Sequence, residues 1–284
     1  MKYLKKIAFV CVLALISLLG YMQYYHLNSN HVALKVLSYL KVWRGDAVNL
    51  TLFEAVERPP IKHDDWSFLL QKYVTKSGKV NYKGFIQDSS RLHKYLEKLS
   101  DNTPGKNWTK EEKIAYWINA YNAFTVLLII NHYPLKSIKD IADGTPMISS
   151  PWDIKFFQLA GIDFDLNAIE HQVLRGQFEE PRIHFAINCA SVSCPNLRNE
   201  AYVAAKIDAQ LADQAQKFLK DSTKNIISSE ALYLSRIFQW FSGDFEVYQT
   251  LHENLSIWSG VSINNSATTQ FMDYDWSLNE QFRP

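Results

Sequence analysis

The sequence contains little cysteine and has no excess of either charge. Three cysteines occur in 284 residues, which excludes the disulfide-dense scaffold of small secreted domains. The formal net charge of +1 gives no reason to expect nucleic acid or an acidic partner. Heptads, internal repeats and low-complexity tracts are also lacking, which excludes coiled coils and repeat arrays. What remains is a globular composition with 47% hydrophobic residues, enough for a sizeable core.

Sequence spacings typical of metal sites are lacking too. No HExxH motif occurs, and Cys189 and Cys194 have no second cysteine pair or histidine pair at zinc-site spacing. Glu170, His171 and His184 would supply two imidazoles and a carboxylate, a ligand set suited to zinc or iron. Since no spacing supports that set, we predict neither a metal nor a cofactor.

The first residues are basic and the next are apolar. Lysines are the only charges in the first six residues, and an apolar run follows from Ile7 to Met22. This order is typical of an export signal whose positive end stays in the cytoplasm. At about 1.5 Å per residue the run spans roughly 24 Å, close to a hydrocarbon core of about 30 Å. The small-residue pair of a signal-peptidase site is missing between Leu18 and Asn30.

We therefore predict a retained signal anchor at residues 1–25, with the N-terminus in the cytoplasm. Secretion after cleavage of the leader is the alternative. Residues 26–60 are predicted to be a connecting arm that ends at Pro59 and Pro60, and residues 61–284 a single globular domain. That domain would lie in an extracytoplasmic, periplasmic-type compartment.

The clearest predicted helix begins after Thr109. Thr109 and Glu112 form a capping box, in which each side chain accepts a hydrogen bond from the other residue's amide. Apolar residues then recur at 4-3-4-3 spacing, as in a core helix that ends before Pro134. Asn119 and Asn122 stand out because asparagine is a poor helix former. We expect them either to brace the fold through hydrogen bonds or to orient a catalytic group or a ligand.

Later segments predict an α+β fold. Asp165 is expected to cap a helix from Leu166 to Leu174, which carries Glu170 and His171. Apolar and polar residues alternate over Arg182–Asn188, which predicts a strand. A long helix near residues 201–219 and short strands near residues 231 and 268 follow. Together these segments predict one mostly helical domain around a small, largely antiparallel sheet.

The two cysteines of the predicted exported domain support two hypotheses. An oxidising compartment favours a disulfide between Cys189 and Cys194, which would close a six-residue loop and contribute about 2 kcal/mol on the chain-entropy model. Alternatively, Cys189 is a nucleophile with His184 as its base, which requires the two side chains within hydrogen-bond reach. Five residues apart on a continuous strand they would point to opposite faces, which argues against that pair, whereas a turn or bulge at Asn188 would bring them together.

Two further hypotheses concern the charged residues. Glu170, His171 and His184 could perform acid–base chemistry, although adjacent helical residues lie about 100° apart and one of the first two would usually point away. In the structural alternative, carboxylates and arginines brace a loop-rich fold through partly buried ion pairs. The residues expected in those pairs are Glu170, Asp165, Arg175, Arg182 and Arg198.

Several strings resemble the family called domain of unknown function 547. They are AYWINAYNAFTV, YPLKSIKDI, IEHQVLR, PRIHFAINCASVSCPNLR, LSRIFQWFSGDF and YDWSLN, in the family's order across about residues 65–280. The resemblance implies no established reaction. The family's motif positions fall on Asn119, Asn122, Glu170, His171, Arg175, His184, Cys189, Cys194 and Pro195. A distant kinship with papain-like or transglutaminase-like folds is a further expectation, and fold alone does not give function.

Two classes of function remain open at this point. The first is a membrane-anchored binding or structural domain of the cell envelope, with an envelope protein or a small molecule as its partner. The second is a cysteine- or histidine-dependent hydrolase or acyltransferase that acts on an envelope substrate. Both attach to the membrane through the N-terminal segment, and neither involves nucleic acid.

Overall fold

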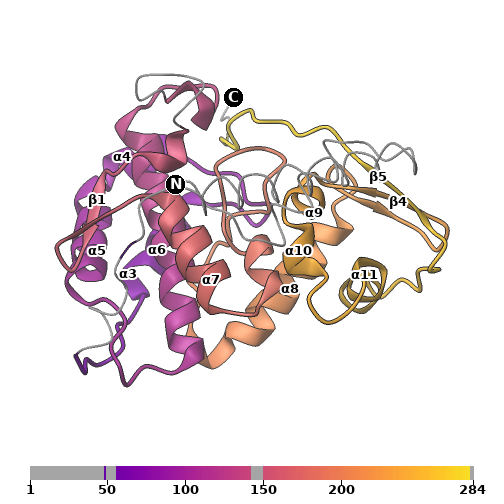
Figure 1. Ribbon diagram of the computed structural model, residues 1–284. Helices are drawn as coiled ribbons and strands as arrows, with labels where there is room; N and C mark the ends of the chain where they lie inside the picture. The colour runs from indigo at the N-terminus through magenta and orange to yellow at the C-terminus, as the bar shows by residue number, and fades with distance from the viewer. Residues whose placement is uncertain (1–47, 49–55, 142–149, 282–284) are drawn as a thin grey trace, which may run out of the picture.

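The computed structural model describes residues 48, 56–141 and 150–281 (Figure 1). The predicted anchor at residues 1–25 lies outside the described residues, as does most of the predicted arm at residues 26–60. The described chain is a mostly helical α+β domain, as the sequence predicts. The α-helices are α3 (Asp64–Tyr73), α4 (Tyr82–Gln87), α5 (Ser89–Asp101), α6 (Lys110–Asn131), α7 (Arg175–Gln177), α8 (Ile207–Lys220), α9 (Ile237–Trp240), α10 (Ser242–Phe245) and α11 (Leu251–Ser259).

Short helices and strands fill the connections. The 3₁₀-helices are η2 (Ile138–Asp140), η3 (Pro151–Asp153), η5 (Pro181–Phe185) and η6 (Ala204–Lys206), and η4 (Ala168–Leu174) is a π-helix. The strands are β1 (Phe157–Leu159), β2 (Ile162–Phe164), β3 (Ile226–Ile227), β4 (Ala231–Leu234) and β5 (Thr268–Phe271). β1 and β2 form an antiparallel hairpin, while β4 pairs antiparallel with β3 and parallel with β5. Two of these three described strand pairs are antiparallel, as the sequence predicts, and the β4–β5 pair is parallel.

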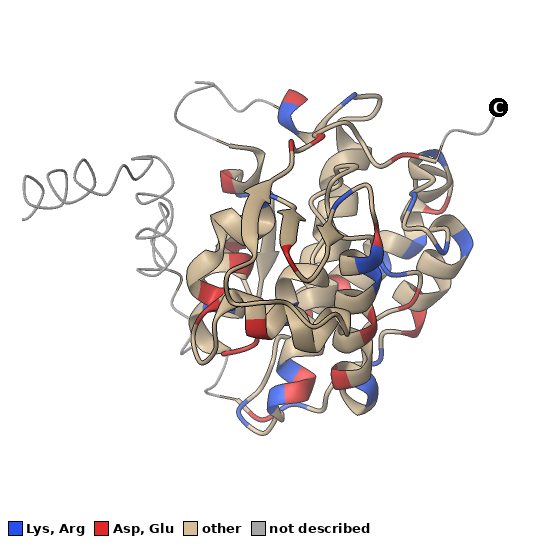
Figure 2. Cartoon of the chain, turned by 90° about the vertical axis from the view of Figure 1, so that its right-hand side faces the viewer, with Lys and Arg blue, Asp and Glu red and all other residues tan. Residues whose placement is uncertain are grey.

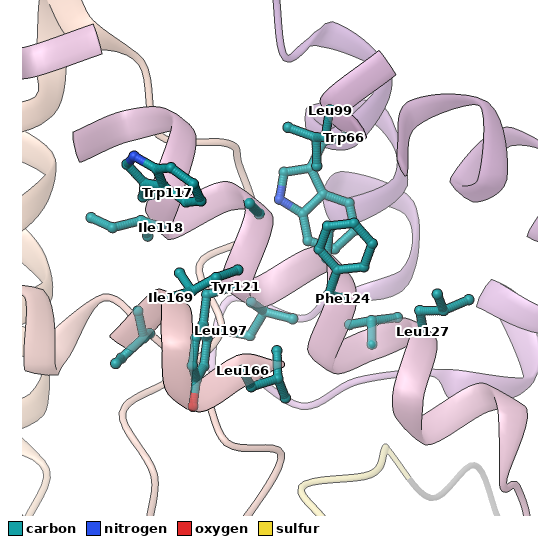
Figure 3. Close-up of a cluster of buried hydrophobic side chains, with 14 of the residues drawn as sticks. Trp66, Leu99, Trp117, Ile118, Tyr121, Phe124, Leu127, Leu166, Ile169 and Leu197 are labelled. Carbon is teal, nitrogen blue, oxygen red and sulfur yellow. The ribbon is translucent and has the colours of Figure 1, made fainter. Parts of the chain in front are cut away.

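Helix α6 is the centre of the first and larger core cluster. Its predicted capping box is present, with the Glu112 amide donating to Thr109 Oγ1 and the Thr109 amide to the Glu112 carboxylate. Every residue from Ile114 to Ile130 is buried, because α4, α5, η4 and η6 pack around the helix. Trp66 of α3, Leu99 of α5 and Ile169 of η4 lie with Tyr121 and Phe124 of α6 in this cluster (Figure 3). Such all-round burial explains why α6 is apolar on every face.

A second core cluster lies beside the first. It joins α8, β4, α9, α10 and α11 around Phe185, Phe238 and Phe245. In Figure 1 the helices α3 to α6 stand on one side, α9 to α11 with β4 and β5 on the other, and α7 and α8 between them. The chain after β5 runs back across the molecule to the first side, where Leu278 pairs with Ser191 and Glu280 with Val80. This return brings C-terminal aromatic residues over the junction of the two clusters.

The predicted strand at Arg182–Asn188 is wrong. Pro181–Phe185 is the 3₁₀-helix η5, and a turn-rich loop follows it. The apolar alternation has another cause, since Ile183 and Ile187 pack into the first core cluster and Phe185 into the second. A segment whose apolar side chains enter two different cores therefore alternates apolar and polar residues, as a strand does.

One described helix, α6, is long and apolar enough to cross a membrane, but 89% of its apolar window is buried inside the domain. That burial is the property of a core helix. On the outside, Lys, Arg, Asp and Glu residues are interspersed (Figure 2).

Candidate active site

A cavity of about 180 Å³ opens where the two core clusters meet. Tyr121 and Ile187 reach it from the first cluster, and Ile237 from the second. The full lining is Tyr121, Trp152, Asn167, Glu170, His171, His184, Ile187, Cys189, Cys194, Pro195, Ile237, Trp240, Phe241, Tyr274 and Trp276. All four catalytic candidates from the sequence, Glu170, His171, His184 and Cys189, thus line one cavity. Their convergence is the central observation about this site.

Asn122 of α6 fixes the segment that carries His184 and Cys189. Its amide nitrogen donates to the Ala186 carbonyl at 2.9 Å, and its amide oxygen accepts from the Asn188 backbone at 2.8 Å. Because both groups are buried, each bond replaces water that the backbone has lost. Asn119, one turn away, makes the same reciprocal pair with the backbone of Tyr202. The two asparagines therefore brace the fold, and Asn122 also positions the catalytic candidates.

The backbone after Cys189 is held in a left-handed turn. Ala190 has a φ of +63°, a conformation that non-glycine residues adopt rarely and only under local constraint. Asn188 and Asn279 supply that constraint, since the Ala190 amide donates to Asn188 Oδ1 and the Asn279 amide to the Ala190 carbonyl. The turn leaves the Cys189 side chain partly exposed at the cavity wall. Cys194, the other cysteine, is buried.

Three side chains surround the Cys189 sulfur. Cys194 Sγ lies 2.8 Å away, the Ser191 hydroxyl 3.2 Å and the Tyr274 hydroxyl 3.3 Å. Burial by itself raises the pKa of the Cys189 thiol, but hydrogen bonds from Cys194, Ser191 and Tyr274 outweigh it and lower that pKa to about 6. The pKa of Cys194 moves the other way, well above its usual range, because of its burial and the adjacent Cys189. Cys189 is therefore the thiolate of the pair near neutral pH, and Cys194 the donor.

Both cysteines are free thiols in the structure. Their 2.8 Å separation exceeds a covalent disulfide bond of about 2.05 Å. The predicted disulfide between them thus stays a prediction.

His184 belongs to a buried polar triad with Asp244 and Arg175. His184 Nε2 lies 2.8 Å from Asp244 Oδ2, and Arg175 donates to both Asp244 oxygens at 2.5 and 3.2 Å. Although burial opposes ionisation, the hydrogen bonds and charges of His184 and Arg175 hold the pKa of Asp244 well below its usual range. An ionised carboxylate can only accept, so the proton of this hydrogen bond is on His184 Nε2. The imidazole also stacks on Phe241, with ring centroids 4.1 Å apart.

The π-helix η4 explains why both Glu170 and His171 reach the cavity. In a π-helix the backbone bonds run from residue i to i+5, and here the Arg175 amide donates to the Glu170 carbonyl. More residues fit into each turn, so the angle between neighbouring side chains is smaller than in an α-helix. The expectation that one of the two would point away is therefore wrong. Asp165 stabilises the start of this helix, with Oδ1 accepting from the Ala168 amide.

The pKa values of Glu170 and His171 are shifted in opposite directions. Burial raises the pKa of Glu170 to about 7, although nearby Arg175 and a hydrogen bond from Tyr121 partly oppose the shift. Burial, together with the charge of Arg175, lowers the pKa of His171 to about 3. Near neutral pH, Glu170 is therefore partly protonated, whereas the imidazole of His171 is neutral. Perturbed groups in a shared cavity are a frequent property of active sites.

Aromatic side chains form one wall of the cavity. Trp240 and Trp276 stack with centroids 5.8 Å apart, and Tyr274 contacts both rings. Trp152 meets Trp276 edge-on at 5.8 Å. The ammonium of Lys139 lies 3.7 Å from the Trp276 ring centroid. This cluster, the aromatic wall, offers a partly exposed apolar surface beside Cys189.

The sequence did not identify Asp244, Tyr274 or Phe241 as site residues. Asp244 follows a glycine in SGDF, and a single aspartate in a loop-like string gives no signal of its partners. The ion pairs in the structure also differ from the bracing pairs that the sequence predicts. Arg175 pairs with Asp244, Arg182 with Glu180 and Asp208, and Arg198 with Glu200 and Asp213. Among these arginines only Arg175 takes part in the site, through Asp244.

Within residues 48, 56–141 and 150–281, no group of three or more histidine, cysteine or acidic side chains is arranged to hold a metal ion. Glu170, His171 and His184 do share the cavity, but Arg175 and Asp244 already engage the two imidazoles. The site combines a thiol with neighbouring proton donors and acceptors, which are the groups that proton transfer and nucleophilic chemistry require.

The comparison with family models confirms part of the predicted relationship. A model described as "Protein of unknown function, DUF547" matches residues 105–219, a span that includes α6, η4 and both cysteines of the cavity. This match supports the resemblance over that part of the chain. Neither the curated proteins nor the solved structures gave a match. The expected papain-like or transglutaminase-like kinship stays a prediction.

Proposed function

We propose that the cavity is the active site of a cysteine-dependent hydrolase or acyltransferase. The observation that carries the proposal is that Cys189 and His184 line one cavity, with Asp244 fixing the imidazole. A nucleophile, a base and a group that orients the base are the three parts of such a site. Cys189 and His184 line this cavity, where the Cys189 sulfur contacts Cys194, Ser191 and Tyr274, and the proposal requires His184 to approach that sulfur during the reaction.

The chemistry would proceed in two steps. The Cys189 thiolate attacks the carbonyl carbon of an ester, thioester or amide, a sulfur–carbon bond forms, and the carbonyl oxygen becomes an oxyanion. Before the attack, His184 takes the proton of the Cys189 thiol on Nδ1 and becomes an imidazolium. Collapse of the intermediate breaks the bond to the leaving group, which takes this proton from His184. Water or another acceptor then gives a proton to His184, attacks the thioester and releases Cys189 as a thiolate. Because Asp244 holds Nε2 of His184, Nδ1 would exchange these protons.

The aromatic wall indicates the kind of acyl group. A dry apolar cavity of about 150 Å³ accommodates benzene, and this cavity measures about 180 Å³. Its Trp240, Tyr274 and Trp276 rings favour apolar or aromatic contacts over charged ones. We therefore propose a short apolar acyl group as the part of the substrate that enters.

Alkylation of the native protein tests the nucleophile. We expect iodoacetamide to label Cys189 in preference to Cys194, with a rate that reaches half its maximum near pH 6 and stays flat above about pH 7. An ordinary cysteine would reach half its maximal rate only near pH 8.5. Peptide mass spectrometry identifies the labelled residue, and Cys189→Ser is the control. Equal labelling of both cysteines, or a midpoint near 8.5, would contradict the proposal.

The same cysteines account for the predicted disulfide. We propose that Cys189 and Cys194 form a reducible pair whose dithiol form is the active one. Closure would pass two electrons and two protons to an oxidised disulfide of a partner, and the Cys189 sulfur would no longer attack a carbonyl. In the alkylation experiment, oxidised protein should take up label at Cys189 only after a reductant is added.

We also propose that the domain is tethered outside the cytoplasm by its N-terminal segment and acts on an envelope substrate. The basic and apolar leader supports this location. A pure binding domain of the envelope is the competing function, and it predicts no covalent adduct at Cys189. Protease added outside intact cells should degrade the domain once the outer barrier is permeabilised, and full protection would contradict the location.

A further inference from the structure

His171 has no role in the two steps above, although it lines the same cavity. Its Nδ1 lies 2.8 Å from Arg175 Nη1. A guanidinium has five donors and no acceptor, and it stays protonated in proteins. Nδ1 must therefore be the accepting, unprotonated nitrogen, and the proton of the neutral ring is on Nε2. This assignment follows from the contact itself.

The orientation of the ring follows from the same contact. Arg175 belongs to the Asp244 triad and does not itself line this cavity. The Nδ1 edge of His171 consequently faces the protein, and its other edge, with Nε2, faces the cavity. Phe241 lies beside both imidazoles. Its ring centroid is 6.3 Å from that of His171 and 4.1 Å from that of His184. The two histidines thus lie beside the same aromatic ring. In His171, Nδ1 accepts from Arg175, whereas in His184, Nε2–H donates to Asp244.

We propose that His171 is a catalytic residue whose Nε2–H donates a hydrogen bond to the oxyanion that forms when Cys189 attacks an acyl group. This inference rests on the proposed function. A neutral imidazole suits the task, because it donates to a developing negative charge without giving up its proton. Arg175 holds the ring in this form through the bond to Nδ1, and its positive charge disfavours a second proton on the imidazole.

Two reactions of Cys189 distinguish a hydrogen bond from His171 to the oxyanion from a purely structural role of His171. Acylation by p-nitrophenyl butyrate passes through an oxyanion, whereas alkylation by iodoacetamide displaces iodide and forms none. We expect His171→Leu to slow acylation of the full-length protein by on the order of 100-fold, and to change the alkylation rate less than about threefold. His171→Gln retains an N–H donor and should recover part of the acylation rate. His93→Leu, on the exposed face of α5, is the matched control and should change neither rate.

The outcomes distinguish the two levels of the proposal. Acylation is followed by p-nitrophenol release and by the mass added to Cys189. If His171→Leu lowers acylation and alkylation equally, or leaves acylation unchanged, the oxyanion role is overturned while the nucleophile stands. If wild-type Cys189 is alkylated but accepts no butyryl group, the proposed function fails and the role of His171 fails with it.

Discussion

Replacing Asp244 by asparagine is expected to lower the free energy of unfolding by about 3–5 kcal/mol, because it leaves the buried Arg175 without its counter-ion. The side chains of Arg175 and Asp244 are 4% and 8% exposed, so water cannot replace the lost partner. Asparagine keeps one carbonyl oxygen, so Arg175 and His184 would share a single neutral acceptor in place of two carboxylate oxygens. With typical urea dependence, the midpoint of unfolding should fall by on the order of 1–2 M, followed by tryptophan fluorescence.

The matched control is Asp208→Asn. Asp208 pairs with Arg182 at 2.8 Å, but its side chain is 84% exposed, and exposed pairs contribute less than about 1 kcal/mol. Equal effects of the two substitutions would contradict the buried triad. The pH dependence has a defined sign, because the pKa of Asp244 is depressed in the folded state. The difference between wild type and Asp244→Asn should persist across neutral pH and shrink only as the pH falls below the ordinary range of aspartate.

Replacing Cys189 by alanine is expected to abolish acyl transfer, with a loss of at least about 10³-fold in the rate of p-nitrophenyl butyrate cleavage. The residual rate should match cleavage without a nucleophile, and no butyryl mass should appear on the protein. Stability should change little by comparison, since the thiol is partly exposed at the cavity wall. A variant that cleaves the ester at the wild-type rate would rule out Cys189 as the nucleophile.

Cys194→Ala separates the nucleophile from its neighbour. Cys194 Sγ lies 2.8 Å from the Cys189 sulfur, and the hydrogen bond between them lowers the pKa of Cys189. Loss of a hydrogen bond to a charged group costs about 1.5–3 kcal/mol, which corresponds to about one to two pH units. The midpoint of Cys189 alkylation should therefore move up by that amount, while acyl transfer persists at high pH. An unchanged midpoint would show that Cys194 does not stabilise the thiolate.

Local patterns predicted the helices well. The capping box at Thr109 and the apolar spacing after it located α6, and the helix predicted near residues 201–219 corresponds to α8. These signals depend on residues within one or two helical turns, so contacts with distant parts of the chain do not alter the helix that they predict. Asn119 and Asn122 were likewise recognised as residues that need partners, since an amide beside a core stripe must be satisfied.

Long-range contacts caused the errors. The segment from Ile183 to Ile187 looked like a strand because it lies between two cores, and no local signal distinguishes those cases. The π-helix η4 was read as an α-helix, so Glu170 and His171 were expected to diverge. Asp244, 60 residues beyond His184, carried no recognisable motif. Each error concerns a contact between segments that the sequence keeps apart.

The sequence by itself determined the basic and apolar leader, the mostly helical α+β class and the set of polar residues worth testing. Only the tertiary structure decided that four of those residues share a cavity and that Asp244 and Tyr274 belong with them. The physical reason is that a helix is encoded by neighbours in the chain, whereas the protonation of Cys189 or His171 depends on groups that folding brings near. Tyr274 reaches Cys189 from 85 residues away, and Arg175 assigns the proton of His171 only because η4 places the two side by side.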